Sequence, residues 1–194
     1  MRIILMGPPG AGKGTQANVI ADRLDVPAIS TGIIFRANVS AETPLGLEAK
    51  RFMDAGDYVP DEVTNAMVRG RIAEEDAKDG FLLDGYPRTV AQVDELDQML
   101  KASAHIIDAV VVLTVDNDEL VQRLMQRAQI EGRSDDSEKV IRRRQDVYNE
   151  QTAPLLAVYA GRGRLVEVDG MGDVDEVTAR VMTGLDKLRS QAAS

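Results

Sequence analysis

The sequence predicts a doubly wound α/β fold, in which helices cover both faces of a five-stranded parallel sheet. Five short apolar runs of strand length recur along the 194 residues, and longer segments with helical periodicity separate them. The strongest runs are continuous rather than alternating, which is typical of strands buried on both faces. Strand-then-helix alternation is the pattern of α/β domains.

The first strand, 2–6, leads into a glycine-rich turn, and the two other strong runs are 80–83 and 109–115. A weaker run at 164–168 and a short one at 27–29 complete the five strands. Helical spacing of apolar residues fills the intervals between them. The helices are expected at approximately 13–24, 32–55 (broken near Pro44), 61–77, 89–101, 117–127, 137–160 and 173–189.

Composition and charge exclude several classes of protein. The chain has 23 Lys and Arg against 32 Asp and Glu, and its net charge of −9 argues against a nucleic-acid or anionic-membrane partner. It has no Cys and a single His, His105, so a disulfide scaffold, thiol catalysis and a multi-histidine or zinc centre are not expected. No apolar run reaches the roughly 18 residues of a membrane span, and the N-terminus does not resemble a signal peptide. We expect a cytoplasmic protein.

The length predicts one domain, 1–194, without internal repeats or linkers. Two segments, 30–60 and 127–137, look like insertions into a core formed by 1–29, 61–126 and 138–194. Such insertions are typical of movable covers over an active site, and ordinary surface loops have the same composition.

The most specific motif is the glycine-rich segment that follows the first strand and opens the first helix. Glycines let several backbone N–H groups point inward, the helix N-terminus adds partial positive charge, and Lys13 adds a full charge. Strand, spacing, lysine and hydroxyl occur together, which favours phosphate binding over a glycine-rich turn with a chance lysine. Unlike the generic loop, this one has Gly14 between the lysine and the hydroxyl of Thr15. The candidate phosphate-binding residues are Gly10, Ala11, Gly12, Lys13, Gly14 and Thr15.

Charged residues form two further candidates. Asp84 ends an apolar strand, where open α/β sheets bind ligands, and its carboxylate could organise the water shell of phosphate-bound Mg²⁺ or simply cap the next turn. Residues 123–144 carry seven basic and four acidic groups, although the chain as a whole is acidic. Guanidinium forks suit phosphate oxygens, so this segment indicates an anionic ligand. A solvated, salt-bridged helix face remains the simpler interpretation for Lys139, Arg142 and Arg143.

Several motifs together resemble those of adenylate kinases. The loop Gly-Pro-Pro-Gly-Ala-Gly-Lys-Gly-Thr-Gln is similar to the phosphate-binding loop of that family, and other motifs follow it in the family's order along nearly the whole chain. They are Ile29-Ser30-Thr31-Gly32 with Arg36, Leu83-Asp84-Gly85-Tyr86-Pro87-Arg88 with Gln92, Arg133-Ser134-Asp135-Asp136, Arg144, and Thr152-Ala153-Pro154-Leu155. The resemblance implies a P-loop NTPase-like fold with a helical NMP-binding insertion at 30–60 and a short lid at 127–137.

The resemblance also implies roles for individual residues in a reversible, Mg²⁺-dependent transfer of a phosphoryl group from ATP to AMP. The residues expected to take part in catalysis are Lys13, Asp84, Arg88, Arg123, Arg133 and Arg144. Arg123, Arg127 and Arg133 are expected to meet ATP or the transferring group, and Arg36, Arg88 and Arg144 the monophosphate. The expected nucleotide contacts are Thr31, Gly85, Tyr86, Pro87, Gln92 and the Asp57, Tyr58 and Val59 backbone for AMP, and Gly172 for the ATP adenine. Mg²⁺ is expected to bind with ATP, mainly through water, and zinc is not expected.

Two alternatives stay open from the residues alone. One is a kinase for another monophosphate, such as UMP or CMP, although Thr31 and the paired donor and acceptor of Gln92 favour AMP. The other is a nucleotide-dependent switch, which needs a water-positioning residue rather than two sets of arginines. One departure from the family pattern stands out, because Ile33 takes a position that is usually acidic. We expect a monomer, since one core with two insertions can enclose both nucleotides.

Overall fold

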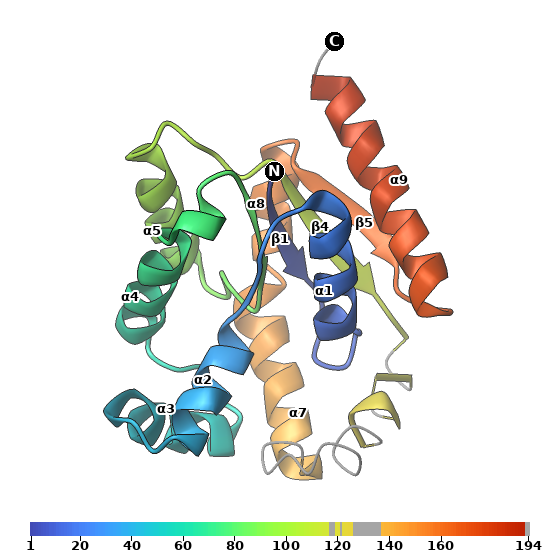
Figure 1. The fold of residues 1–194 in the computed structure, drawn as a ribbon. Coiled ribbons are helices and arrows are strands. Elements are labelled where there is room, and N and C mark those ends of the chain that lie inside the picture. Colours follow the sequence, from blue (N-terminus) through green and yellow to red (C-terminus); the bar gives the residue numbers. More distant parts are fainter. Residues whose placement is uncertain (117–118, 121, 126–136, 193–194) are drawn as a thin grey trace.

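The computed structural model describes residues 1–116, 119–120, 122–125 and 137–192, and a parallel sheet of five strands lies at its centre (Figure 1). The strands are β1 (Arg2–Met6), β2 (Ala28–Ser30), β3 (Phe81–Asp84), β4 (Ala109–Thr114) and β5 (Leu165–Asp169). Their order in the sheet is β2-β3-β1-β4-β5, and every neighbouring pair is parallel. The first strand is therefore central and the chain winds outward from it on both sides, which confirms the predicted doubly wound α/β fold.

Helices cover both faces of this sheet. The described helices, in chain order, are α1 (Lys13–Leu24), α2 (Thr31–Ser40), α3 (Pro44–Ala55), α4 (Asp61–Ile72), α5 (Val90–Lys101), α7 (Glu138–Val147), α8 (Leu155–Gly161) and α9 (Val174–Ala192), with a 3₁₀ turn, η1 (Glu75–Ala77), and a π-helical turn, η3 (Tyr148–Thr152). None of the described helices is long and apolar enough to span a membrane.

Each face of the sheet has its own hydrophobic core, because successive strand residues point to opposite sides. Ile3 and Leu5 of β1 pack in one cluster with side chains of α1 and α9. Ile4 and Met6 pack in a second cluster with side chains of α4, α5 and α8. These four side chains of β1 are all buried, which is why the strand is continuously apolar after Arg2.

The expected helix at 137–160 is the clearest difference from the sequence prediction. The structure divides it into α7, the π-helical turn η3 and α8. The N–H of Ala153 reaches back five residues to the carbonyl oxygen of Tyr148 (2.9 Å), and Pro154, which follows, has no N–H to continue the ladder. The wide turn brings Tyr148 and Thr152 to the wall of the cavity described below.

The other elements agree with the prediction more closely. The break expected near Pro44 separates α2 from α3, with Thr43 as the N-cap that accepts from the N–H of Gly46 (3.0 Å). The helix expected at 61–77 ends at Ile72 and is followed by η1. Residues 119–120 and 122–125 are helical, and the rest of the expected 117–127 helix lies outside the described residues.

The segment 30–60 has a small core of its own. Phe35 of α2, Ala49 of α3 and Val59 form a buried cluster, separate from the two clusters of the sheet. Val63 and Met67 of α4 also pack against this cluster, and Met67 packs against the second cluster of the sheet as well, so α4 connects the segment to the core. Except for Ser137, the expected short lid at 127–137 and its Arg127 and Arg133 lie outside the described residues.

Candidate active site

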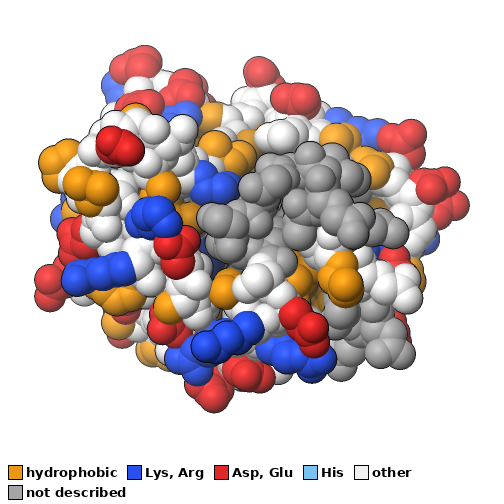
Figure 2. Space-filling model, turned by 90° about the horizontal axis from the view of Figure 1, so that it is seen from below, with side chains coloured by type: hydrophobic (Ala, Val, Ile, Leu, Met, Phe, Trp, Pro, Cys, Tyr) orange, Lys and Arg blue, Asp and Glu red, His pale blue; other side chains and the backbone are white. Residues whose placement is uncertain are grey.

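A cavity of about 770 Å³ opens at the carboxyl ends of the strands, where the sequence predicts the site. Figure 2 shows this end of the molecule, where Lys and Arg side chains lie both on the face and along its edge, and many Asp and Glu side chains lie toward the rim. The cavity wall includes each sequence-predicted site residue that the structure describes. These are Gly10, Ala11, Gly12, Lys13, Gly14, Thr15, Thr31, Arg36, Asp57, Tyr58, Val59, Asp84, Gly85, Tyr86, Pro87, Arg88, Gln92, Arg123, Arg144 and Gly172.

The glycine-rich loop connects β1 to α1 at the floor of this cavity. A side chain at Gly10 would place its Cβ 2.9 Å from the carbonyl oxygen of Leu120, and the φ of this residue is +90°, so glycine is required there. Lys13 is the first residue of α1, and its Nζ donates to the carbonyl oxygens of Gly7 (2.7 Å) and Pro8 (2.9 Å). The ammonium group therefore lies against the loop, beside the positive end of the helix dipole. This arrangement favours an anion such as a phosphate.

Asp84 lies at the carboxyl end of β3, in register with Leu5 of β1 and Ser30 of β2. The hydroxyl of Ser30 donates to Asp84 Oδ2 (3.0 Å), which fixes the carboxylate at the cavity wall. Thr15, exposed in the first turn of α1, adds a hydroxyl oxygen to the same cavity. Carboxylate and hydroxyl oxygens fit Mg²⁺, which keeps several of its waters. Among the described residues no three or more Asp, Glu, His or Cys side chains are placed to hold a metal ion together, so the fit is to an ion held largely by water and phosphate.

Arg88 lies in the turn between β3 and α5, and four contacts hold it. Its N–H donates to Gln92 Oε1 (2.7 Å), and its carbonyl oxygen accepts from Thr152 Oγ1 (2.9 Å). Its Nε donates to the carbonyl oxygen of Gly85 (2.7 Å), and its guanidinium carbon lies 4.7 Å from the centre of the Tyr58 ring. A guanidinium has five N–H donors, of which this set of anchors uses the one on Nε. The arrangement holds the fork in one place beside the cavity.

Gly85 brings two polar side chains to a single peptide group. Its carbonyl oxygen accepts from Thr31 Oγ1 (3.0 Å) as well as from Arg88 Nε. Its φ is +80°, and an added Cβ would lie 2.8 Å from Thr31 Oγ1 and 2.9 Å from Arg88 Nη2. Glycine at this position therefore permits both the backbone conformation and the close approach.

The Gln92 side chain has its amide orientation fixed by its neighbours. Gln92 is buried, with 1% of its surface exposed, and its Nε2 donates to Asp61 Oδ1 (2.6 Å) while its Oε1 accepts from the N–H of Arg88. Thr89 Oγ1 donates to the other carboxylate oxygen, Asp61 Oδ2 (2.7 Å). If the Gln92 amide were flipped, its oxygen would face the carboxylate of Asp61 and its NH₂ group would face the N–H of Arg88. Neither contact could be a hydrogen bond, so only the observed orientation fits. Gln92 can offer the cavity one donor and one acceptor in a defined order.

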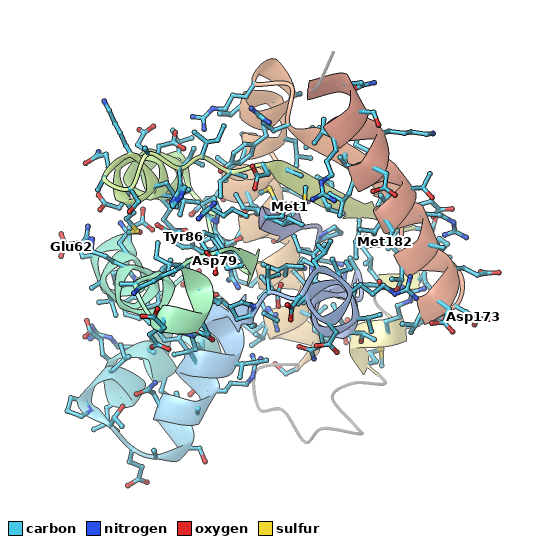
Figure 3. All side chains as sticks on the ribbon, turned by 45° about the horizontal axis from the view of Figure 1, so that its top comes forward. Met1, Glu62, Asp79, Tyr86, Asp173 and Met182 are labelled. Carbon is cyan, nitrogen blue, oxygen red and sulfur yellow. The ribbon has the colours of Figure 1, made fainter. Side chains whose placement is uncertain are left out.

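Tyr86 is a core residue as well as a cavity-wall residue. Its side chain is fully buried beside α4 and α5, where Figure 3 labels it, and its hydroxyl donates to Asn65 Oδ1 (2.8 Å). Burial raises the pKa of the Tyr86 hydroxyl well above its usual value, so this group stays protonated. The peptide bond between Tyr86 and Pro87 is cis.

The insertion 30–60 is joined to the helices opposite it through two neighbouring residues. Asp57 pairs with Arg143 of α7 (2.7 Å), and this hydrogen bond raises the pKa of the Arg143 guanidinium. Tyr58 Oη lies 2.7 Å from Thr152 Oγ1 of η3. Arg142 pairs instead with Glu138 on its own helix (2.9 Å), so Arg142 and Arg143 form the salt-bridged face that was the simpler interpretation for them.

Two further arginines and a glycine lie on the wall nearer the loop. Arg123 donates through Nε to Glu119 Oε1 (2.8 Å) and through Nη1 to the carbonyl oxygen of Gly170 (3.4 Å). Gly172 is exposed, with a φ of +103°, and Arg144 of α7 is half-buried. These residues come from three separate segments. They converge on one cavity with the phosphate loop.

The structure adds site residues that the sequence analysis did not assign. Ser30 and Thr152 belong to motifs quoted in the sequence analysis, which assigned neither residue a role. Asp61 and Tyr148 carried no signal, because their importance depends on contacts with distant residues. Tyr148 lines the cavity, and burial raises the pKa of its hydroxyl to about 12.

Comparisons with known proteins agree with this geometry. The family model described as adenylate kinase matches residues 5–164. Among curated proteins, the chain is 69% identical to an adenylate kinase of Nocardioides sp. over 186 residues, which are 96% of this chain and 97% of the relative. It is 61% identical to one of Kocuria rhizophila (96% and 99% covered) and 59% identical to one of Renibacterium salmoninarum (97% and 98% covered). The chain therefore belongs to the adenylate kinase family and is a phosphotransferase enzyme.

Proposed function

We propose that the enzyme transfers the terminal phosphoryl group of ATP to AMP, reversibly and with Mg²⁺, giving two molecules of ADP and so maintaining the balance of adenine nucleotides. The observation that carries the proposal is one cavity that holds both a phosphate-binding loop and the Arg88–Gln92 unit. The first suits a triphosphate, and the second suits a nucleoside monophosphate. One chain supplies both sets of described residues, which supports a monomer. The cytoplasm is its proposed location.

The reaction needs alignment and charge neutralisation rather than a covalent intermediate. An oxygen of the AMP phosphate attacks the γ-phosphorus of ATP, and the bond from that phosphorus to the β–γ bridging oxygen breaks. The attacking oxygen is already ionised at neutral pH, so no general base is required. This fits a cavity that is rich in arginines.

Each set of residues has its part in this scheme. The loop N–H groups and Lys13 would hold the ATP phosphates, with Arg123 and, from outside the described residues, Arg127 and Arg133 neutralising the transferring group. Arg36, Arg88 and Arg144 would hold the AMP phosphate. Lys13, Arg88, Arg123 and Arg144 belong to the core 1–29, 61–126 and 138–194, Arg36 belongs to the NMP-binding insertion 30–60, and Arg127 and Arg133 belong to the lid 127–137. The insertion and the lid would exclude water.

The base contacts follow the order of donor and acceptor that Gln92 presents. Adenine offers a donor amino group beside an acceptor nitrogen, which matches an amide whose orientation is fixed by Asp61 and the Arg88 N–H. Thr31 and the backbone of 57–59 would complete the AMP pocket, and the backbone at Gly172 would receive the ATP adenine. This order supports AMP over UMP as the acceptor. Cytosine also presents an amino group beside an acceptor nitrogen, so the kinetic test below is what separates CMP from AMP.

The test is to incubate the enzyme with MgATP and each nucleoside monophosphate in turn and to resolve the products. ADP as the only product with AMP, at a kcat/KM far above that for UMP or CMP, supports the proposal. Preferential formation of UDP or CDP would identify a kinase for another monophosphate. Formation of ADP and free phosphate without an acceptor would indicate a nucleotide-hydrolysing switch.

We predict that activity depends on Mg²⁺ and on no tightly bound transition metal. Asp84, held by Ser30, and the hydroxyl of Thr15 would contact a hydrated Mg²⁺ that travels with ATP and lowers the charge of its phosphates. Zinc prefers sites rich in Cys and His, and the chain offers only His105. Dialysis against a chelator should abolish activity, and Mg²⁺ alone should restore it fully. Stoichiometric zinc by elemental analysis would contradict this prediction.

Ile33 gives a test of the monophosphate side. Its side chain is 56% exposed in the first turn of α2 and lines the cavity, and Arg36 follows on the same helix. An aspartate there would gain about 0.3–1 kcal/mol from the helix dipole and would change the field around Arg36. We expect Ile33→Asp to fold and to change the KM for AMP more than the KM for ATP. Steady-state kinetics with each nucleotide varied separately would decide, and equal shifts would remove position 33 from the AMP site.

A further inference from the structure

Tyr58 contacts Arg88 by two routes. Its ring lies beneath the guanidinium, with the Arg88 Cζ 4.7 Å from the ring centre, and its hydroxyl reaches Thr152, whose own hydroxyl donates to the carbonyl oxygen of Arg88. Tyr58 therefore contacts the side chain of Arg88 directly and the backbone of Arg88 through Thr152.

The direction of the hydrogen bonds follows from the number of protons. The hydroxyl of Thr152 has one proton, and the carbonyl oxygen of Arg88, 2.9 Å away, can only accept it. The hydroxyl of Tyr58 must then donate to Thr152 Oγ1, which is 2.7 Å away. Thr152 is buried, with 5% of its surface exposed, so this short chain of bonds is shielded from water.

A guanidinium fork that must meet a phosphate needs a fixed plane as well as a fixed position. The bond from Arg88 Nε to the Gly85 carbonyl oxygen fixes one edge of the fork, and a ring beneath its face restricts rotation about that edge. Tyr58 comes from the insertion 30–60, whereas Arg88, Gly85 and Thr152 do not. The stacking therefore forms only when the insertion lies against the rest of the site.

We propose that Tyr58 is a positioning residue for Arg88: its ring sets the plane of the guanidinium, and its hydrogen bond to Thr152 holds the ring in place. The inference rests on the proposed phosphoryl transfer to AMP, in which Arg88 holds the acceptor phosphate. It gives the side chain of Tyr58 a role in addition to the backbone contact with AMP expected from the sequence.

The test compares two substitutions that divide the two contacts. Tyr58→Phe keeps the ring and removes the hydroxyl, and Tyr58→Leu removes both. We expect Tyr58→Leu to lower kcat/KM for AMP about tenfold and Tyr58→Phe about two- to threefold, with the KM for ATP changed less than about twofold in both. A loss in Tyr58→Phe as large as that in Tyr58→Leu would overturn the role of the ring.

The second part is a double-mutant cycle with Arg88→Ala. If Tyr58 acts through Arg88, then Tyr58→Leu should change kcat/KM for AMP by less than about twofold in the Arg88→Ala background. The full tenfold loss in that background would overturn the proposal, because the ring would then act on something other than Arg88.

A matched control removes another ring from the same insertion. Phe52 of α3 lies under the guanidinium of Arg51 (4.8 Å to the ring centre), away from Arg88. Phe52→Leu should change neither kcat/KM for AMP nor the KM for ATP by more than about twofold. If Phe52→Leu instead lowered kcat/KM for AMP as much as Tyr58→Leu does, a loosened insertion would explain both losses, and the proposal would be overturned. An unmodified enzyme that does not phosphorylate AMP at all would instead contradict the proposed function.

Discussion

Replacing Lys13 with alanine is expected to lower kcat by about 10²- to 10³-fold while the fold persists. The ammonium group lies at the start of α1, against the carbonyl oxygens of Gly7 and Pro8, and is the one full positive charge in the segment Gly7–Thr15. In the proposed reaction it neutralises charge on the ATP phosphates, and the loss of one such donor costs about 3 kcal/mol of barrier. The measurement is steady-state kinetics at saturating ATP and AMP.

Two controls separate catalysis from folding in this variant. Lys187, exposed on α9, is far from the loop in sequence and lines no part of the cavity, so Lys187→Ala should keep the full kcat. Far-ultraviolet circular dichroism of Lys13→Ala should match that of the unmodified enzyme, since α1 keeps its buried residues Ile20 and Ala21. A kcat within about fivefold of the unmodified value would contradict the assigned role.

The sheet could be predicted from the sequence because its cause is local. Ile3, Ile4 and Leu5 are apolar in succession since both faces of β1 are covered, and the same holds for Val110, Val111 and other residues of β4. The π-helical turn could not be predicted in the same way. One extra residue in a turn shifts the apolar pattern by a single position, and helical spacing that already alternates between three and four residues hides this shift, so 137–160 is predicted as one helix.

The candidate site likewise has features that depend on neighbouring residues in the chain and features that depend on distant ones. The phosphate loop is one contiguous motif, and the arginines match positions in motifs that resemble those of the family, so both can be recognised in the sequence. The hydrogen bonds that orient the functional groups join residues far apart: 54 positions separate Ser30 from Asp84, and 94 separate Tyr58 from Thr152. No periodicity or motif spacing specifies such pairs. The sequence therefore predicts which side chains line the cavity, and the structure is needed to show what holds them.

Arg88→Ala is expected to lose as much activity as Lys13→Ala, but through the AMP phosphate rather than through the ATP phosphates. Its guanidinium is held by the Gly85 carbonyl oxygen and the Tyr58 ring, and its backbone by Thr152 and Gln92. Much of the side-chain entropy of Arg88 is therefore lost before the substrate arrives. Removing such a preorganised donor should lower kcat about 10²- to 10³-fold and raise the KM for AMP. Arg88→Lys should recover only part of the loss, because an ammonium keeps the charge and lacks the planar fork.

The matched control is Arg162, which also lies over a tyrosine ring, that of Tyr159 (5.4 Å), and pairs with Asp97 outside the cavity. Arg162→Ala should keep the full kcat. Ligand-induced shifts of the unfolding temperature then assign the two losses to their sites, since a ligand stabilises the fold only where it binds. AMP should raise Tm in Lys13→Ala and much less in Arg88→Ala, and ATP should do the reverse. Equal AMP shifts in both variants would mean that Arg88 does not hold the monophosphate.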